Sequence, residues 1–252
     1  MLKLFIAGIL LAQTYIVPGR LRPAVACTAP DETTNSADLL WWVDTTSVTE
    51  SGGEVSEMTD QSAAGNDWTQ ATGSKQPSLV TNAFGTGRDG IQGDNDATDD
   101  NVALASTKTL SGDLSAYYLV KHNSSDASVA YLTADGANNS FRINTAENLV
   151  IRCNASTTTL TTGGVISNAE THLVEFHRDG SSNWTVYVDG VDVTNGTPNN
   201  VEDCTQLYML MSTNGGGESD IIIGASVTYT SDHTSSDDRD CIRDYYDAWW
   251  ND

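Results

Sequence analysis

The sequence predicts an all-β protein: an antiparallel two-sheet jelly-roll sandwich with one short C-terminal helix and an extended N-terminal arm. Tight-turn dipeptides separate alternating runs, and about a dozen short segments are rich in β-branched and aromatic residues. Helical spacing of apolar residues occurs only near the end of the chain. Many short strands beside a single terminal helix are typical of sandwiches and jelly rolls.

The strongest turn signal is the pair Asp189-Gly190. Residues 184–188 before it and 191–194 after it alternate in side-chain type. Asp-Gly between such runs favours a two-residue hairpin, because both turn residues take positive φ. Similar pairs lie beside other strand-like runs, at Asp135-Gly136, Asp179-Gly180 and Asn214-Gly215.

Strand-forming segments recur along the whole domain. The expected strands are residues 37–44, 48–59 with an interruption at Gly52-Gly53, 79–80, 102–104, 117–120, 129–132, 141–143, 149–151, 173–176, 184–188, 191–194, 207–211 and 221–229. By alternation Trp184 faces the core, and at least one of Trp41 and Trp42 does so too.

The last segment has the features of a helix. Ser235 or Ser236 can cap its start, and Asp237 and Asp238 suit the positive end of the helix dipole. An apolar face follows at helical spacing, formed by Cys241, Ile242, Tyr245 and Trp249.

The net charge of the chain argues against two classes of binding partner. The chain has 12 Lys and Arg against 34 Asp and Glu, a net charge of −22. Such a surface repels phosphate backbones and anionic headgroups, so we expect neither nucleic acid nor membrane as a partner. At 252 residues the chain can form one large β-domain.

Residues 1–33 form a segment of their own, ahead of a domain at residues 34–252. Lys3 precedes an apolar run that resembles a signal peptide, and residues 24–27 offer a cleavage site. Arg20 and Arg22 argue against cleavage, and the run is shorter than the about 20 residues of a membrane span. The alternative is an arm docked on a neighbouring subunit, anchored by Leu4, Phe5, Ile6, Ile9, Leu10 and Leu11. Residues 28–36 are polar and suggest a linker.

The four cysteines lack the spacing of a zinc site, because no C-x-x-C pair occurs. Cys153 and Cys204 both lie in strand-like regions and can pair. The sequence allows three connectivities, and four reduced thiols are the alternative.

Several motifs together resemble a known superfamily. Residues 42–44, 48–55, 60–67, 69–71 and 76–77 follow one another in the order of laminin-G-like jelly rolls of the concanavalin A-like lectin/glucanase superfamily. The variety they resemble is common in phage virion proteins and bacterial surface proteins.

This resemblance covers about residues 37–252. It continues at residues 99–102, 178–180 and 187–190, and in the final helix with Tyr245, Tyr246 and Trp249. It implies a lectin-like fold but no particular activity, since this fold has many functions.

Catalytic motifs are absent from the sequence. Glu54 and Glu57 depart from the E-x-D-x-x-E strand of the glucanases and point to opposite faces of a strand. His172 and His177 are also an odd number of residues apart, and neither H-E-x-x-H nor G-x-S-x-G occurs. We therefore expect no enzyme.

An acid-rich loop is a candidate calcium site. Calcium prefers oxygen ligands, and four aspartates crowd within seven residues beside Asn95 and Asn101. These are Asp94, Asp96, Asp99 and Asp100. A water-exposed turn explains the same pattern, and no other cofactor is expected.

Sugar binding requires an exposed aromatic ring beside polar groups. Trp68 is the loop candidate, flanked by Asn66, Asp67 and Gln70. Tyr187 points away from the face of Trp184 and is the candidate on a strand. Any single aromatic residue is more often structural than ligand-binding.

These observations favour a non-enzymatic protein of a phage virion surface. We expect capsid decoration or a head fibre, attached to a capsid or other virion protein through residues 1–33, with glycans and a homo-oligomer as further candidate partners. The alternatives are a secreted or surface-anchored bacterial carbohydrate-binding module with a cleaved leader, and a glycan hydrolase. The expected location is the virion surface or, in the alternatives, outside the cell or on its surface.

Overall fold

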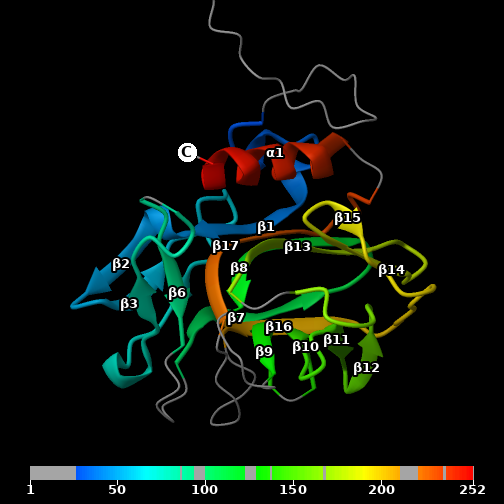
Figure 1. Ribbon diagram of the computed structural model, residues 1–252, viewed down its shortest axis with the longest axis horizontal. Coiled ribbons are helices and arrows are strands. Elements are labelled where there is room, and N and C mark those ends of the chain that lie inside the picture. Colours follow the sequence, from blue (N-terminus) through cyan, green and yellow to red (C-terminus); the bar gives the residue numbers. More distant parts are fainter. Residues whose placement is uncertain are drawn as a thin grey trace, which may run out of the picture.

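The computed structural model describes residues 27–85, 87–93, 100–122, 129–136, 138–166, 169–210, 221–234 and 237–251. The described part is mostly antiparallel β-structure, arranged in two layers, with the helix α1 (Asp237–Asn251) lying over one of them (Figure 1). The predicted all-β class and the C-terminal helix are thus confirmed. No helix among the described residues has the length and hydropathy to cross a membrane.

The first layer lies under the helix. Its neighbouring strands are, in order, β1 (Leu39–Asp44), β17 (Ile221–Tyr229), β8 (Leu114–His122), β13 (Thr171–Arg178), β14 (Trp184–Val188) and β15 (Val191–Asp192). Every one of these pairs is antiparallel.

The second layer lies on the far side from the helix. Its neighbouring strands are, in order, β4 (Trp68–Thr69), β7 (Val102–Leu110), β16 (Cys204–Met209), β9 (Ala130–Ala134), β10 (Ser140–Ile143), β11 (Leu149–Cys153) and β12 (Ser156–Thr159).

Four short strands lie beside the two layers. They are β2 (Val48–Ser51), β3 (Glu54–Met58), β5 (Ser78–Val80) and β6 (Gly90–Gln92). Three of them, β3, β5 and β6, connect the layers. β3 pairs with β4 of the second layer, β5 joins β3 to β6, and β6 pairs with β17 of the first. Hydrogen bonding therefore runs through one sheet of 17 strands, and the two-sheet jelly-roll form remains a prediction.

Two hydrophobic clusters explain why these strands pack in layers. On β8, Tyr118 and Val120 point into the core between the layers. Tyr117 and Leu119 point the other way, into a cluster shared with the helix residues Ile242, Tyr245 and Tyr246. Successive residues of a strand face opposite sides, so β8 at the centre of the first layer is buried on both faces.

The Asp189-Gly190 hairpin forms as predicted. Both residues have positive φ, 49° and 76°, and the pair connects β14 to β15. The Asp189 carboxylate accepts a hydrogen bond from the Leu173 amide at 2.9 Å and lies 2.7 Å from His172 Nδ1. The turn is therefore held against β13.

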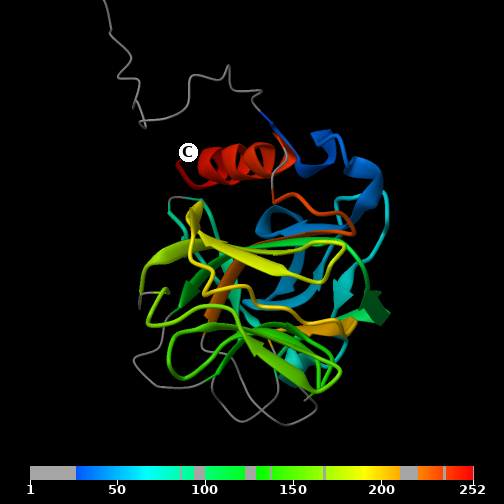
Figure 2. The same cartoon turned by 90° about the vertical axis from the view of Figure 1, so that its right-hand side faces the viewer.

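Residues 27–38 pack against the helix (Figure 2). Cys27 forms a disulfide with Cys241 in α1. The Thr34 amide and the Asn35 side chain each donate to the Asp238 carboxylate at 2.7 Å. Residues 28–36, which the sequence suggests as a linker, are thus held to the domain.

A second disulfide joins Cys153 of β11 to Cys204 of β16, the pairing considered from the sequence. Its two Cα atoms are 4.4 Å apart, within the range that a disulfide spans. It joins the end of β11 to the start of β16, two strands that do not pair with each other but come close at this point.

Candidate functional site

Trp68 is a core residue, contrary to the expectation that it contacts sugar. Its side chain has no exposed surface and meets Trp41 edge to face, with ring centroids 5.3 Å apart. Trp68 lies on the short strand β4, whose pairing with β7 turns the ring inward. A ring without exposed surface offers no stacking platform.

The three polar residues around Trp68 support the loop that contains them. Asp67 accepts a hydrogen bond from the Asp60 amide at 2.8 Å, and the Asn66 side chain donates to the Leu40 carbonyl at 2.7 Å. The Gln70 side-chain oxygen accepts from the Thr72 amide at 3.0 Å. These hydrogen bonds brace the chain around β4.

Tyr187 points away from the core between the layers, as expected, but a side chain of α1 lies over its ring. The guanidinium of Arg239 in α1 lies 3.6 Å from the Tyr187 ring centroid, a cation–π contact. His177 meets the same ring edge to face at 5.6 Å. Tyr187 is therefore part of the contact between layer and helix, which the sequence could not foresee, because alternation does not show what covers a face.

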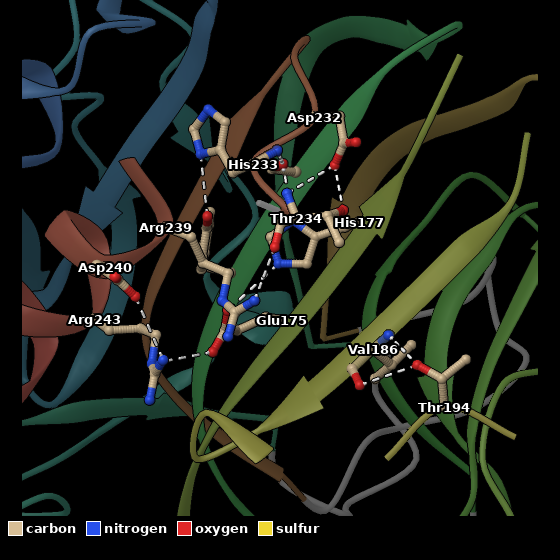
Figure 3. Close-up of polar contacts among 12 residues, drawn as sticks. Glu175, His177, Val186, Thr194, Asp232, His233, Thr234, Arg239, Asp240 and Arg243 are labelled. Atoms are coloured by element: carbon tan, nitrogen blue, oxygen red, sulfur yellow. Dashed lines mark hydrogen bonds and ion pairs between the residues drawn. The ribbon is translucent and has the colours of Figure 1, made fainter. Parts of the chain in front are cut away.

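That contact contains a buried ion cluster centred on Glu175 (Figure 3). The Glu175 side chain has no exposed surface, and its carboxylate lies 3.3 Å from His177 Nε2 on the same strand. Arg239 and Arg243, one helical turn apart, approach it at 3.3 and 3.6 Å. The cluster joins α1 to β13.

The cluster continues into a hydrogen-bonded network behind His177. Ser115 Oγ lies 2.9 Å from His177 Nδ1 and donates to the Ser231 carbonyl at 2.8 Å. His233 lies 3.1 Å from the Tyr117 hydroxyl. Burial, together with the nearby His177, lowers the pKa of His233 to about 4, so His233 is neutral at pH 7.

Serine, histidine and glutamate in this order are reminiscent of an acyl-transfer relay. Here Ser115, His177 and Glu175 each have no exposed surface. The Ser115 hydroxyl also donates its hydrogen to a backbone carbonyl instead of to the histidine. The arrangement attaches the helix and gives no substrate access.

The predicted calcium loop and the predicted anchoring residues lie, except for Asp100, outside the part of the chain that the structure describes. Asp94, Asp96 and Asp99 lie outside the described residues, as do Leu4, Phe5, Ile6, Ile9, Leu10 and Leu11. Asp100 is described and is buried, with 2% of its surface exposed. No cluster of three or more His, Cys, Asp or Glu suited to a metal occurs in the described parts of the chain.

A different surface has aromatic and charged side chains suited to binding a ligand. It is the side of the second layer that faces away from the core, here called the outer face. Cross-strand partners share a face, so the registers of β7, β16, β9, β10, β11 and β12 define two rows on it. The first row is Ala103, Tyr208, Ala134, Ser140, Arg152 and Thr157. The second row is Tyr131, Arg142, Val150 and Thr159.

The outer face has a floor of small residues between longer side chains. Ala134 and Ser140 are buried, at 0% and 1% exposure, although they point away from the core. Tyr131, Tyr208, Arg142 and Arg152 are half-buried around them. A bulge in β9 at residue 132 brings Tyr131 and Ala134 to the same side.

The sequence carried a signal for this surface that reasoning from motifs missed. Arg142 lies between Phe141 and Ile143, and Arg152 follows three apolar residues, and both arginines are at outward positions. In a chain with so few basic residues, two arginines on adjacent strands are a notable concentration of positive charge.

No family model and no curated protein matches the chain. Among solved structures, the binding domain of Paraclostridial Mosquitocidal Protein 1 has a TM-score of 0.58 at 10% identity, covering 84% of this chain and 53% of that one. The binding domain of Botulinum Neurotoxin DC in complex with SialylT has a TM-score of 0.57 at 11% identity, covering 87% and 52%. A Trypanosoma rangeli sialidase in complex with 2,3-difluorosialic acid has a TM-score of 0.56 at 14% identity, covering 94% and 36%.

At these identities the likeness shows the fold alone. The chain spans about a third of the length of the sialidases and about half of the toxin chains. The shared all-β fold fits a lectin-like domain, while the superfamily and phage type suggested by the sequence remain predictions.

Proposed function

We propose that this protein is a non-enzymatic glycan-binding module. The observation that carries the proposal is the outer face, where two tyrosines and two arginines surround the buried Ser140. Rings with a polar tip suit the apolar and hydroxyl faces of a sugar. Support also comes from the solved likenesses, which include a toxin binding domain in complex with SialylT and a sialidase in complex with 2,3-difluorosialic acid.

The proposed location is the surface of a phage virion, as capsid decoration or a head fibre held by the N-terminal arm. The sequence resemblance and the acidic surface support this location. The two disulfides agree with a protein that functions outside the reducing cytosol.

A glycan array with the full chain tests glycan binding. We expect binding to a subset of glycans that is lost when Tyr131 and Tyr208 are both changed to Ala. Val191→Ala, at a residue 63% exposed in the first layer, is the matched control and keeps binding. An array without any bound glycan, or a double variant that binds like the parent, contradicts the proposal.

The secreted bacterial module is the second candidate, because the described domain fits it equally well. Mass spectrometry of the native protein separates the two, since an intact Met1 contradicts a cleaved leader. The glycan hydrolase is the third candidate and is favoured by the sialidase likenesses. Release of free sugar by the purified protein would support it.

A further inference from the structure

We propose that the outer face binds glycans through a sugar carboxylate, held by Arg142 and Arg152. This inference rests on the proposed glycan-binding function and names the class of sugar: an acidic monosaccharide unit, such as a uronic or sialic acid, within or at the end of a short chain. Three features of the outer face support this assignment.

The first feature is the arginines themselves. Among the described residues, neither Arg142 nor Arg152 has a carboxylate within ion-pair distance, although acidic residues outnumber basic ones almost three to one. By contrast, Arg239 and Arg243 share Glu175. A guanidinium presents a planar fork that matches a carboxylate, so these two groups are available to an external anion.

The second feature is a set of buried polar atoms without partners. Ser140 Oγ has no hydrogen-bond partner although the residue is 99% buried, and the Nε atoms of Arg142 and Arg152 are also buried and without a hydrogen bond. A buried polar group without a hydrogen-bond partner destabilises the folded protein. All three lie on one face, because Ser140 pairs directly with Arg152 and is two residues from Arg142. The outer face therefore has a polar centre that no group of the described residues pairs with.

The third feature is the aromatic side of the outer face. Tyr131 is the cross-strand partner of Arg142, whose guanidinium lies 5.9 Å from the Tyr131 ring centroid. Tyr208 and Arg152 lie three strand spacings apart across Ala134 and Ser140, about 14 Å from backbone to backbone. This span is enough for a sugar ring to contact a tyrosine while its carboxylate reaches an arginine.

The charge of the whole molecule limits the size of the ligand. At physiological salt, charges are screened beyond about 8 Å, so a carboxylate in direct contact with an arginine is attracted despite the net charge of −22. A long polyanion extends over acidic surface and is repelled along its length. The outer face therefore suits isolated acidic units and disfavours polyanionic chains.

The test compares carboxylated oligosaccharides with their neutral forms on the full chain. The probes are uronic- and sialic-acid-terminated oligosaccharides, the same molecules with the carboxyl group reduced to the alcohol, and sulfated lactose, all measured by calorimetry or saturation-transfer NMR. We expect at least tenfold weaker binding of the reduced forms and of sulfated lactose than of the carboxylated forms.

The variants Arg142→Ala and Arg152→Ala each lower the affinity for the carboxylated probes at least tenfold. Arg142→Lys, which keeps the charge without the fork, gives an intermediate loss. Lys121→Ala removes one positive charge from β8 in the first layer and leaves the affinity unchanged. Unchanged melting temperatures of the variants show that they fold.

The outcomes separate the inference from the proposed function. Equal binding of the carboxylated and reduced probes, or alanine variants that fold and bind like the parent, overturns the carboxylate assignment while leaving glycan binding intact. Sulfated lactose that binds as tightly as the carboxylated probes overturns it as well. If no oligosaccharide binds, both the inference and the proposed function fail.

Discussion

At the scale of single residues, Glu175 determines how the helix meets the first layer. One buried carboxylate lies within ion-pair distance of His177 and of two arginines from α1. Removing one partner from a buried ion pair typically costs about 3–5 kcal/mol, because the remaining charges lose their compensation. The helix side of the cluster carries at least two positive charges, so it depends on this carboxylate.

We therefore expect Glu175→Gln to lower the free energy of unfolding by about 3 kcal/mol. Urea unfolding followed by fluorescence measures the loss. Glu57→Gln, at a half-buried position in β3, is the control and should change stability by less than about 0.5 kcal/mol. Similar losses in the free energy of unfolding for both variants would show that the buried ion cluster does not stabilise the fold more than an ordinary surface carboxylate does.

His233 makes stability depend on pH. Burial lowers its pKa to about 4 in the folded protein, while an unfolded histidine has a pKa of about 6.5. Between these values the unfolded chain takes up the proton and the folded chain does not. The stabilisation from neutral His233 is therefore full above pH 6.5 and is lost as the pH falls toward 4.

The expected loss from His233 over this window is about 3 kcal/mol. It is measured by urea unfolding at a series of pH values between 7 and 4. His233→Asn, which retains a polar group near Tyr117 but does not titrate, should show a shallower decline. Parallel curves for the two proteins would contradict the role of His233.

The residues of the expected sugar site show where sequence reasoning stops. Alternation assigns Trp184 to the core, and its exposure of 1% confirms this. The same rule places Tyr187 on the opposite face but says nothing about what lies above it, and the helix supplies Arg239 there. Trp68 follows no regular alternation, because β4 has only two residues.

At the scale of elements, the helix and residues 27–38 stabilise each other. The Cys27–Cys241 disulfide and the hydrogen bonds to Asp238 attach this segment to the start of α1. The Tyr229 hydroxyl also donates to the Pro30 carbonyl at 2.6 Å, so the segment contacts the first layer as well.

Changing both Cys27 and Cys241 to Ser should lower the free energy of unfolding by about 2–4 kcal/mol. It should also make residues 27–38 sensitive to limited proteolysis, read by mass spectrometry. The paired control, Cys153→Ser with Cys204→Ser, removes the other disulfide and leaves these residues protected. Protection that persists without Cys27 and Cys241 would show that the hydrogen bonds are enough.

Most elements could be predicted from the sequence, and two that were missed in whole or in part, β12 and β7, share a physical cause. The hairpin at Asp189-Gly190 and the helix follow local rules that need no partner. β12, at Ser156–Thr159, is polar because it is an edge strand that is largely exposed, so it lacks the apolar signal. β7 continues to Leu110 through exposed polar residues, and only its first part resembled a strand.

At the scale of the whole molecule, the outer face contrasts with the acidic remainder of the chain. Only the register between β10 and β11 shows that its two arginines lie close together on one face. The sequence shows each arginine singly, and no local pattern reveals that Ser140 lies between them without a hydrogen-bond partner. A site formed by several strands depends on pairing between segments that lie far apart in the sequence.

The arm hypothesis predicts the behaviour of a truncated protein. Deleting residues 1–26, which keeps Cys27, should leave a domain with unchanged melting temperature that no longer associates with virions, as measured by sedimentation with particles. Deletion of residues 1–33 should in addition lower the melting temperature, because it removes the disulfide to α1. Normal association after removal of residues 1–26 would contradict the arm hypothesis.

The bond between Cys27 and Cys241 also determines how the molecule responds to tension. The two cysteines are 214 residues apart along the chain, and the disulfide links them directly. Force is therefore transmitted across this bond instead of along the residues between the two cysteines. A force that enters ahead of Cys27 and leaves beyond Cys241 passes through two sulfur atoms and the final turns of α1. The strands between them bear none of this load, so a molecule pulled by its two ends keeps its sheet folded and extends only at its tails.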